Sequence, residues 1–130
     1  MVSAYGYTDV AGLELFSSED YGLIDPTYLT DPHVDAKITS AERKINTYTG
    51  TSFSGTIPDG IIDTTNVIAH RMILKWLSRH KFELSKEQLQ EAAKPLLSND
   101  VTLILNKYKQ TEISPISLHR MYNNNPNVSY

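Results

Sequence analysis

The feature that most constrains this fold is a set of apolar residues between positions 61 and 77 that recur at the spacing of an α-helix. The main stripe contains Ile61, Ile62, Thr65, Ile68, Met72, Trp76 and Leu77, and it is widened by Val67, Ala69, Ile73 and Leu74. A helix with so wide an apolar surface must be covered from several sides. We therefore expect a central helix beginning near Asp59, with Ile68, Met72 and Trp76 in the core.

A second long helix is predicted from Asp31 to Gly50. Asp31 can supply an N-cap oxygen, Pro32 suits the first helical position, and glycine is preferred just past a helix end. Apolar residues recur at spacings of four and three along this segment: Val34, Ile38, Ala41, Ile45 and Tyr48. This stripe places Ile38 and Ile45 in the core. Residues 51–58 are predicted to form a loop.

Two shorter helices are predicted closer to the C-terminus. Ser85 and Gln88 have the spacing of a capping box, and Pro95 bends or ends the helix that they begin. Its expected inner face contains Leu89, Ala92, Ala93 and Leu96. The next helix follows a cap within residues 98–100 and carries Val101, Ile104, Leu105 and Tyr108 on one side. The predicted fold is mainly α, a small bundle of about four helices over residues 31–110.

Both ends of the chain lack long helical periodicity and are predicted to be extended arms. Residues 1–30 mix aromatic side chains with glycine and proline, and a short helix over residues 9–16 is the one element expected there. Residues 111–130 contain two prolines and three consecutive asparagines, yet they are too apolar for a solvated tail. We expect the apolar side chains of this C-terminal arm to contact a partner: Ile113, Ile116, Leu118, Met121 and Tyr122.

Composition argues against several classes of function. A net charge of -3, from 12 basic and 15 acidic residues, gives no general attraction for nucleic acid. The absence of cysteine excludes disulfides and thiolate metal sites. No stretch approaches the roughly 18 apolar residues of a membrane span. The N-terminus lacks the charged start and apolar run of a secretory signal, which predicts synthesis and assembly in the cytoplasm.

No group of residues has the pattern of a catalytic or metal site. The histidines are scattered along the chain, without a pair at metal-ligand spacing: His33, His70, His80 and His119. Residues 50–55 are rich in small side chains but lack the lysine of a phosphate-binding loop. Residues 17–20 place two hydroxyls beside two carboxylates, with no base nearby in sequence. We expect no enzymatic activity and no cofactor.

One local basic feature stands out. Arg71, Lys75 and Arg79 follow one another at spacings of four along the central helix, and Lys81 follows shortly after. The row is compatible with an ordinary solvated helix face. It is also compatible with salt bridges to acidic residues of a neighbouring subunit, or with a weakly basic ring lumen through which DNA passes.

Three segments carry a resemblance to a known family. In the segment AERKINTYTGTSF, residues 41–53, a helix ends in a turn that contains tyrosine, threonine, glycine, small residues and phenylalanine. In the segment IPDGIID, residues 57–63, an Ile-Pro pair precedes the start of a long helix. The segment VIAH, residues 67–70, continues that helix. A late helix is then followed by an extended C-terminal segment. In this order the signals resemble the head-tail connector, or adaptor, family of tailed double-stranded-DNA phages.

The resemblance covers the middle two thirds of the chain and implies a structural function. Members of that family form a ring, commonly of about twelve copies, on the portal protein at the capsid vertex. The ring receives the next neck protein, such as a stopper or tail terminator, and genomic DNA passes through the lumen without specific binding. The implied location is the neck of the virion. The long aromatic N-terminal segment and the break at Pro95 depart from the family pattern.

Three other classes of function compete with the one that this resemblance implies. A stopper or tail terminator is expected to be rich in β-strands, unlike this sequence. A small helical DNA-binding or regulatory protein is the main alternative, and it would need a recognition helix with clustered base-reading side chains on a basic surface. The acidic composition argues against it. A small hydrolase is a third alternative, for which the sequence offers no catalytic group.

Overall fold

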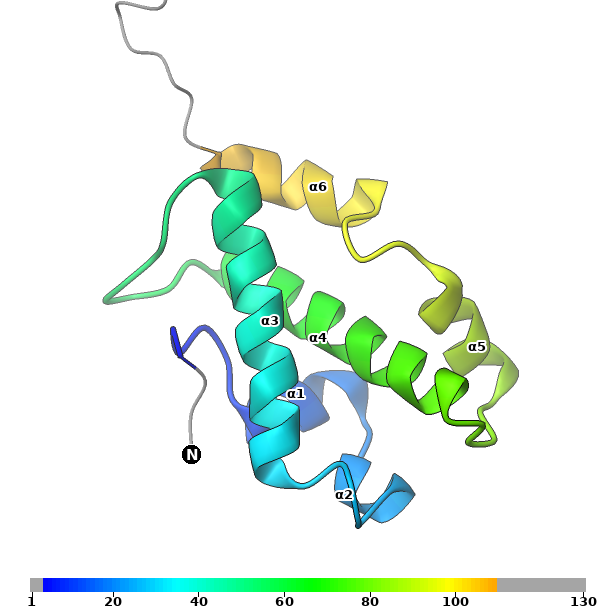
Figure 1. Ribbon diagram of the computed structural model, residues 1–130. Helices are drawn as coiled ribbons and strands as arrows, with labels where there is room; N and C mark the ends of the chain where they lie inside the picture. The colour runs from blue at the N-terminus through cyan, green and yellow to red at the C-terminus, as the bar shows by residue number, and fades with distance from the viewer. Residues whose placement is uncertain (1–3, 110–130) are drawn as a thin grey trace, which may run out of the picture.

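The structure is a computed structural model that describes residues 4–109, and within that range it is mainly helical and contains no strand (Figure 1). The described elements are α1 (Val10–Ser17), α2 (Tyr21–Ile24), α3 (Asp31–Thr49), α4 (Asp59–Arg79), α5 (Lys86–Ala93), α6 (Asn99–Leu105) and the short 3₁₀ helix η1 (Asn106–Tyr108). None of these helices combines the length and hydrophobicity that a membrane span requires. The predicted mainly α fold is confirmed.

The local signals that begin and end the longer helices act as predicted, with one shift. Gly50 ends α3 in the left-handed conformation, at φ 80°. Ser85 and Gln88 form both hydrogen bonds of the capping box at the start of α5. At the start of α3, however, the N-cap residue is Thr30, and Asp31 is the first helical residue. The acidic side chain of Asp31 therefore lies in the first turn, where the helix dipole favours a negative charge.

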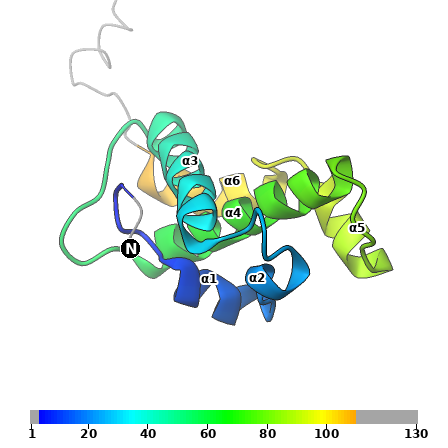
Figure 2. The ribbon, with the colours of Figure 1, turned by 60° about the horizontal axis from the view of Figure 1, so that its bottom comes forward.

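The core lies around α4, which packs against α1, α3, α5 and α6. Figures 1 and 2 show α1 and α2 lying together near the N-terminal end of α3, whereas α6 lies near its C-terminal end. Of the side chains expected in the core, Ile38, Ile45 and Ile68 are fully buried. The apolar stripes of α3 and α4 therefore pack against each other. The shorter helices cover the rest of the apolar surface of α4.

The prediction that Met72 and Trp76 lie in the core is wrong, because both are only partly buried at its edge. Each step of four residues turns the side chain by about 40° around the helix axis, so a stripe that starts at Ile68 leaves the buried face within two steps. Ile73 and Leu77 are fully buried instead. A similar shift affects α5, where Ala92 is buried but the predicted inner residues Leu89 and Ala93 are exposed.

The described part of the N-terminal segment is not an extended arm, and that prediction is also wrong. Its aromatic and leucine side chains belong to the core, among them Tyr7, Leu13, Tyr21 and Leu29. Glu42 of α3 is fully buried and its carboxylate accepts hydrogen bonds from the backbone amides of Tyr5 (3.1 Å) and Tyr7 (2.8 Å). These apolar residues have no regular spacing, so their burial depends on the tertiary structure. The predicted C-terminal arm, residues 111–130, lies outside the described residues.

Candidate functional site

Arg71, the first residue of the predicted basic row, is in the interior of the protein. Its side chain is 1% exposed. Its guanidinium group donates hydrogen bonds to the Glu91 carboxylate (2.7 Å), the Pro95 carbonyl (3.1 Å), the Ser98 hydroxyl (2.7 Å) and the Asp100 carboxylate (3.2 Å). One side chain thus joins α4 to α5, to the linker that contains Pro95 and to the start of α6. Arg71 therefore does not contribute to a subunit contact or a ring lumen.

The two carboxylates that bind Arg71 are kept ionised by their contacts. Burial raises the pKa of Glu91, but hydrogen bonds from Arg71 and Lys94 outweigh this effect and place that pKa below its ordinary value. Hydrogen bonds from Ser98 and Arg71 likewise lower the pKa of Asp100. The group is a charge network within one subunit. It holds the α5–α6 region against the central helix.

The other two residues of the basic row have separate environments. The ammonium group of Lys75 donates to the carbonyl oxygens of Ala92 (2.6 Å) and Lys94 (2.8 Å), so it caps the C-terminal end of α5. Arg79 is exposed, near Lys37 of α3, whose pKa is lowered by burial and by the charge of Arg79. Within residues 4–109, these three cations therefore do not form a continuous basic stripe on the surface. A position for Arg79 at a subunit contact or in a ring lumen stays a prediction.

The Trp76 ring lies in an aromatic cluster at the C-terminal end of α4. It stacks on His80, with ring centroids 3.9 Å apart. Three further rings, those of His33, Tyr28 and Phe82, have centroids 5.8 to 6.1 Å from it. Neighbouring rings therefore surround the indole, and we assign the cluster to packing at the edge of the core.

A hydroxyl and imidazole network joins the N-terminal segment to α4. The Tyr21 hydroxyl lies 3.0 Å from Ser17 Oγ and 2.7 Å from His70 Nδ1. Burial raises the pKa of Tyr21 and lowers the pKa of His70, so both groups are held neutral. Ser17 also donates to the Leu13 carbonyl oxygen. A serine that is committed to its own helix, beside a protonated phenol, is a structural contact rather than an activated nucleophile.

The lowered pKa of His70 predicts a loss of stability in mild acid. Its folded-state pKa is below the unfolded value of 6.5, so the unfolded chain binds this proton first and stability falls as the pH decreases below about 6.5. We expect the melting temperature of the protein to fall between about pH 7.5 and pH 5.5, and to fall less in His70→Gln, whose amide can still bond to Tyr21. Differential scanning fluorimetry across this range measures the difference. Parallel curves for the two proteins would contradict the role of His70.

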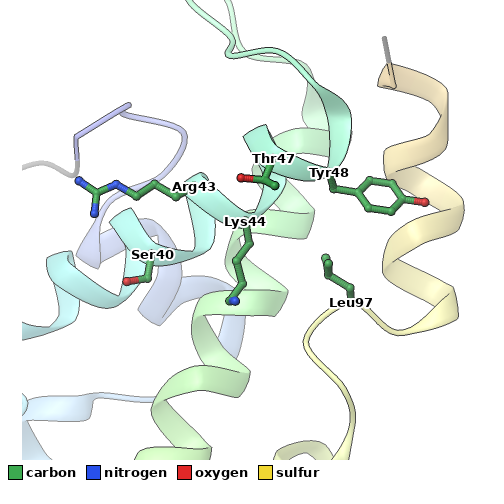
Figure 3. Close-up of a pocket in the computed structure, with 6 residues that line it drawn as sticks. All are labelled: Ser40, Arg43, Lys44, Thr47, Tyr48 and Leu97. Atoms are coloured by element: carbon green, nitrogen blue, oxygen red, sulfur yellow. The ribbon is translucent and has the colours of Figure 1, made fainter. Parts of the chain in front are cut away.

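An open groove of about 520 Å³ lies between the C-terminal half of α3 and the linker that precedes α6. Its lining residues, shown in Figure 3, are Ser40, Arg43, Lys44, Thr47, Tyr48 and Leu97, and we call it the basic groove. In Figure 3 the Lys44 side chain extends down from α3 and the Tyr48 ring extends toward α6 above Leu97, whereas Arg43 extends away from Leu97. The Tyr48 hydroxyl donates to Asn106 (2.6 Å), and the Lys109 ammonium lies 4.9 Å from the centre of its ring.

The opposite end of the molecule is acidic. Residues 1–36 contain seven Asp and Glu residues and no Lys or Arg. Within this segment Asp35 is 5% exposed, and neither of its carboxylate oxygens has a hydrogen-bond partner among the described residues. Burial and the nearby charges of Asp31 and Asp9 raise the pKa of Asp35. We call residues 9–35, which form α1, α2 and the first turn of α3, the acidic end.

Sequence reasoning did not single out either surface. The signal for the acidic end was present in the sequence, since the first basic side chain is Lys37. The basic groove had only a weak signal, because Arg43 and Lys44 lie off the apolar stripe of α3 and Leu97 comes from a segment without periodicity. The candidate contact residues of the C-terminal arm, Ile113 to Tyr122, lie outside the described residues. No three His, Asp or Glu side chains within residues 4–109 are arranged to hold a metal ion.

Comparison with protein-family models, with curated proteins and with solved structures finds no match for this chain. The function of this chain is therefore inferred from its own residues, contacts and exposed surfaces.

Proposed function

We propose that this chain is a structural head-tail connector of a tailed phage, which forms a homo-oligomeric ring on the portal protein and joins it to the next neck or tail protein. The proposal begins from the resemblance of residues 41–53 and 57–63 to that family. The mainly helical body agrees with it. Its location would be the neck of the virion, and its action would be binding rather than catalysis.

The observation that carries the proposal is the exposure of large apolar side chains on several helices of a chain that already has a buried core. Leu15 of α1 is 83% exposed, Leu23 of α2 is 82% exposed and Leu103 of α6 is 68% exposed. Single exposed leucines are common on protein surfaces, but here they occur near both ends of α3. Apolar side chains at two ends of one subunit are what a protein needs to contact a neighbour on each side.

The alternative, a small helical DNA-binding or regulatory protein, has less support. Two of the three cations in the predicted basic row, Arg71 and Lys75, are already bound to oxygen atoms of the same chain. They are not available to bind phosphates, which supply most of the affinity in protein–DNA contacts.

Electron microscopy of the purified protein, alone and mixed with the portal protein of the same virus, tests the proposal. We expect rings, either free or bound to the portal. Particles that remain single subunits in both samples would overturn the proposed function.

Deleting residues 112–130 is expected to abolish attachment to the portal while the helical body stays folded. The deleted segment carries apolar side chains without helical spacing, and its two prolines favour an extended backbone that can bind along a partner. Circular dichroism checks the fold, and co-sedimentation with the portal measures attachment. Unchanged portal binding by the truncated protein would show that the anchor lies elsewhere in the chain.

A further inference from the structure

The two ends of the subunit carry opposite, unbalanced charge. At the acidic end, Asp9, Asp20 and Asp31 are exposed. No acidic side chain of that end forms a salt bridge with another described residue. The salt bridges within residues 4–109 join Arg71 and Lys94 to Glu91 and Asp100. Carboxylates gathered without a lysine or arginine side chain repel one another, so this end of the molecule gains from a positively charged neighbour.

The basic groove is the complementary surface. Arg43 and Lys44 are exposed and form no salt bridge with the described residues. Lys107 and Lys109 are also exposed, and they lie at the end of α6 near Tyr48. This side of the subunit therefore carries four cations, two of which, Arg43 and Lys44, line the partly apolar groove.

Apolar side chains accompany the charge on both surfaces. Leu15 and Leu23 extend from the acidic end, and each is more than four-fifths exposed. Leu97, which is 37% exposed, and the ring of Tyr48 line the basic groove. A charged rim around apolar contacts is the usual composition of a specific protein interface.

We propose that the occupant of the basic groove is the acidic end of a second copy of this chain. Leu15 or Leu23 of one copy would enter the groove beside Leu97 and Tyr48, and the exposed aspartates would face Arg43 and Lys44. This assignment rests on the proposed ring and specifies which surfaces join its subunits.

The placement of the two surfaces agrees with a ring. They are different surfaces at opposite ends of α3, so the contact is head to tail and leaves a free groove and a free acidic end on every pair (Figure 1). Contacts of this kind continue from subunit to subunit until the rotation closes a ring. An antiparallel twofold pair would use both surfaces of both copies and stop at two subunits, a size that mass photometry distinguishes from a ring.

Charge reversal of each surface gives a sharp test. One variant carries Arg43→Glu and Lys44→Glu, and a second carries Asp20→Lys and Asp31→Lys. Thermal melting checks folding, because Asp20 also caps α2. A control variant, Lys81→Glu with Lys86→Glu, changes the net charge as much as the groove variant does but at exposed positions outside both surfaces. Mass photometry, alone and with the portal, measures the size of the assemblies.

We expect each reversed variant alone to need at least a tenfold higher protein concentration to assemble than the unmodified protein. Like charges then meet at every contact. An equimolar mixture should regain it, since each reversed surface meets an opposite charge on the other variant. The control should assemble as the unmodified protein does. A second measurement uses the absence of native cysteine: a mixture of Leu23→Cys and Leu97→Cys proteins should form a mixed disulfide dimer when dissolved oxygen oxidises the two thiols.

The outcomes separate this inference from the proposed function. Rings that persist in both reversed variants, or a mixture that fails to regain assembly, would overturn the pairing of these surfaces and leave the connector proposal standing. An unmodified protein that neither forms rings nor binds the portal would overturn both.

Discussion

Replacing Arg71 with alanine is expected to lower the free energy of unfolding by roughly 2–4 kcal/mol. The substitution removes every hydrogen bond that joins α4 to Glu91, Ser98 and Asp100, and it leaves a space where a fully buried side chain lay. The loss is less than for a completely buried ion pair, because the Glu91 and Asp100 side chains are 28% and 64% exposed and water can hydrate them. Chemical denaturation followed by circular dichroism measures the change.

Two variants control for this result. Arg79→Ala removes the same side chain from the exposed side of the same helix, and it should change stability by no more than about 0.5 kcal/mol. Arg71→Lys keeps the charge but cannot reproduce the fork of donors, so it should resemble the alanine variant more than the unmodified protein. If Arg71→Ala and Arg79→Ala were equally stable, the buried network would contribute nothing to the fold.

Replacing Glu42 with alanine is expected to cost roughly 3–5 kcal/mol and to release the N-terminal segment from α3. The Glu42 carboxylate is fully buried and is the acceptor for the backbone amides of Tyr5 and Tyr7. Without it, the buried Tyr7 amide and the partly buried Tyr5 amide lose their acceptor, and hydrogen bonds to a carboxylate are among the stronger ones in proteins. Thermal melting measures the global change.

Hydrogen exchange locates the same effect along the chain. In Glu42→Ala, the amides of residues 5–30 should exchange faster, whereas α4 should lose protection only through global unfolding. Glu42→Gln keeps one acceptor oxygen and is expected to fall between the alanine variant and the unmodified protein. Uniform loss of protection across all helices would mean that Glu42 supports the whole core rather than the N-terminal segment.

The contacts of Glu42 also position the proposed assembly surface. The amides that it binds precede α1, and α1 and α2 carry Leu15 and Leu23 of the acidic end. A variant that releases this segment should therefore lose assembly as well as stability. The charge-reversed variant of the same surface should lose assembly while its melting temperature falls much less than that of Glu42→Ala, which distinguishes a contact effect from a folding effect.

The sequence by itself determined the helices of the body. Apolar spacing located α3 and α4, glycine at position 50 ended α3, the capping box began α5 and Pro95 separated α5 from α6. These signals are local, since each depends on residues within a few turns of one helix. They also placed Ile38, Ile45 and Ile68 on buried faces, because the middle of a stripe stays on one side of its helix.

Only the tertiary structure decided which side chains are inside where periodicity is weak or where partners are distant in sequence. Arg71 is buried because Glu91 and Asp100, 20 and 29 residues further along the chain, meet it there. Tyr7 and Tyr21 are buried because α3 and α4 offer them Asn46 and His70 as hydrogen-bond partners. A helical stripe specifies a direction from its own axis, and it does not specify what lies in that direction. Contacts between segments settle that question, and they gather the acidic residues 9–35 at one end of this subunit and form the basic groove near the other.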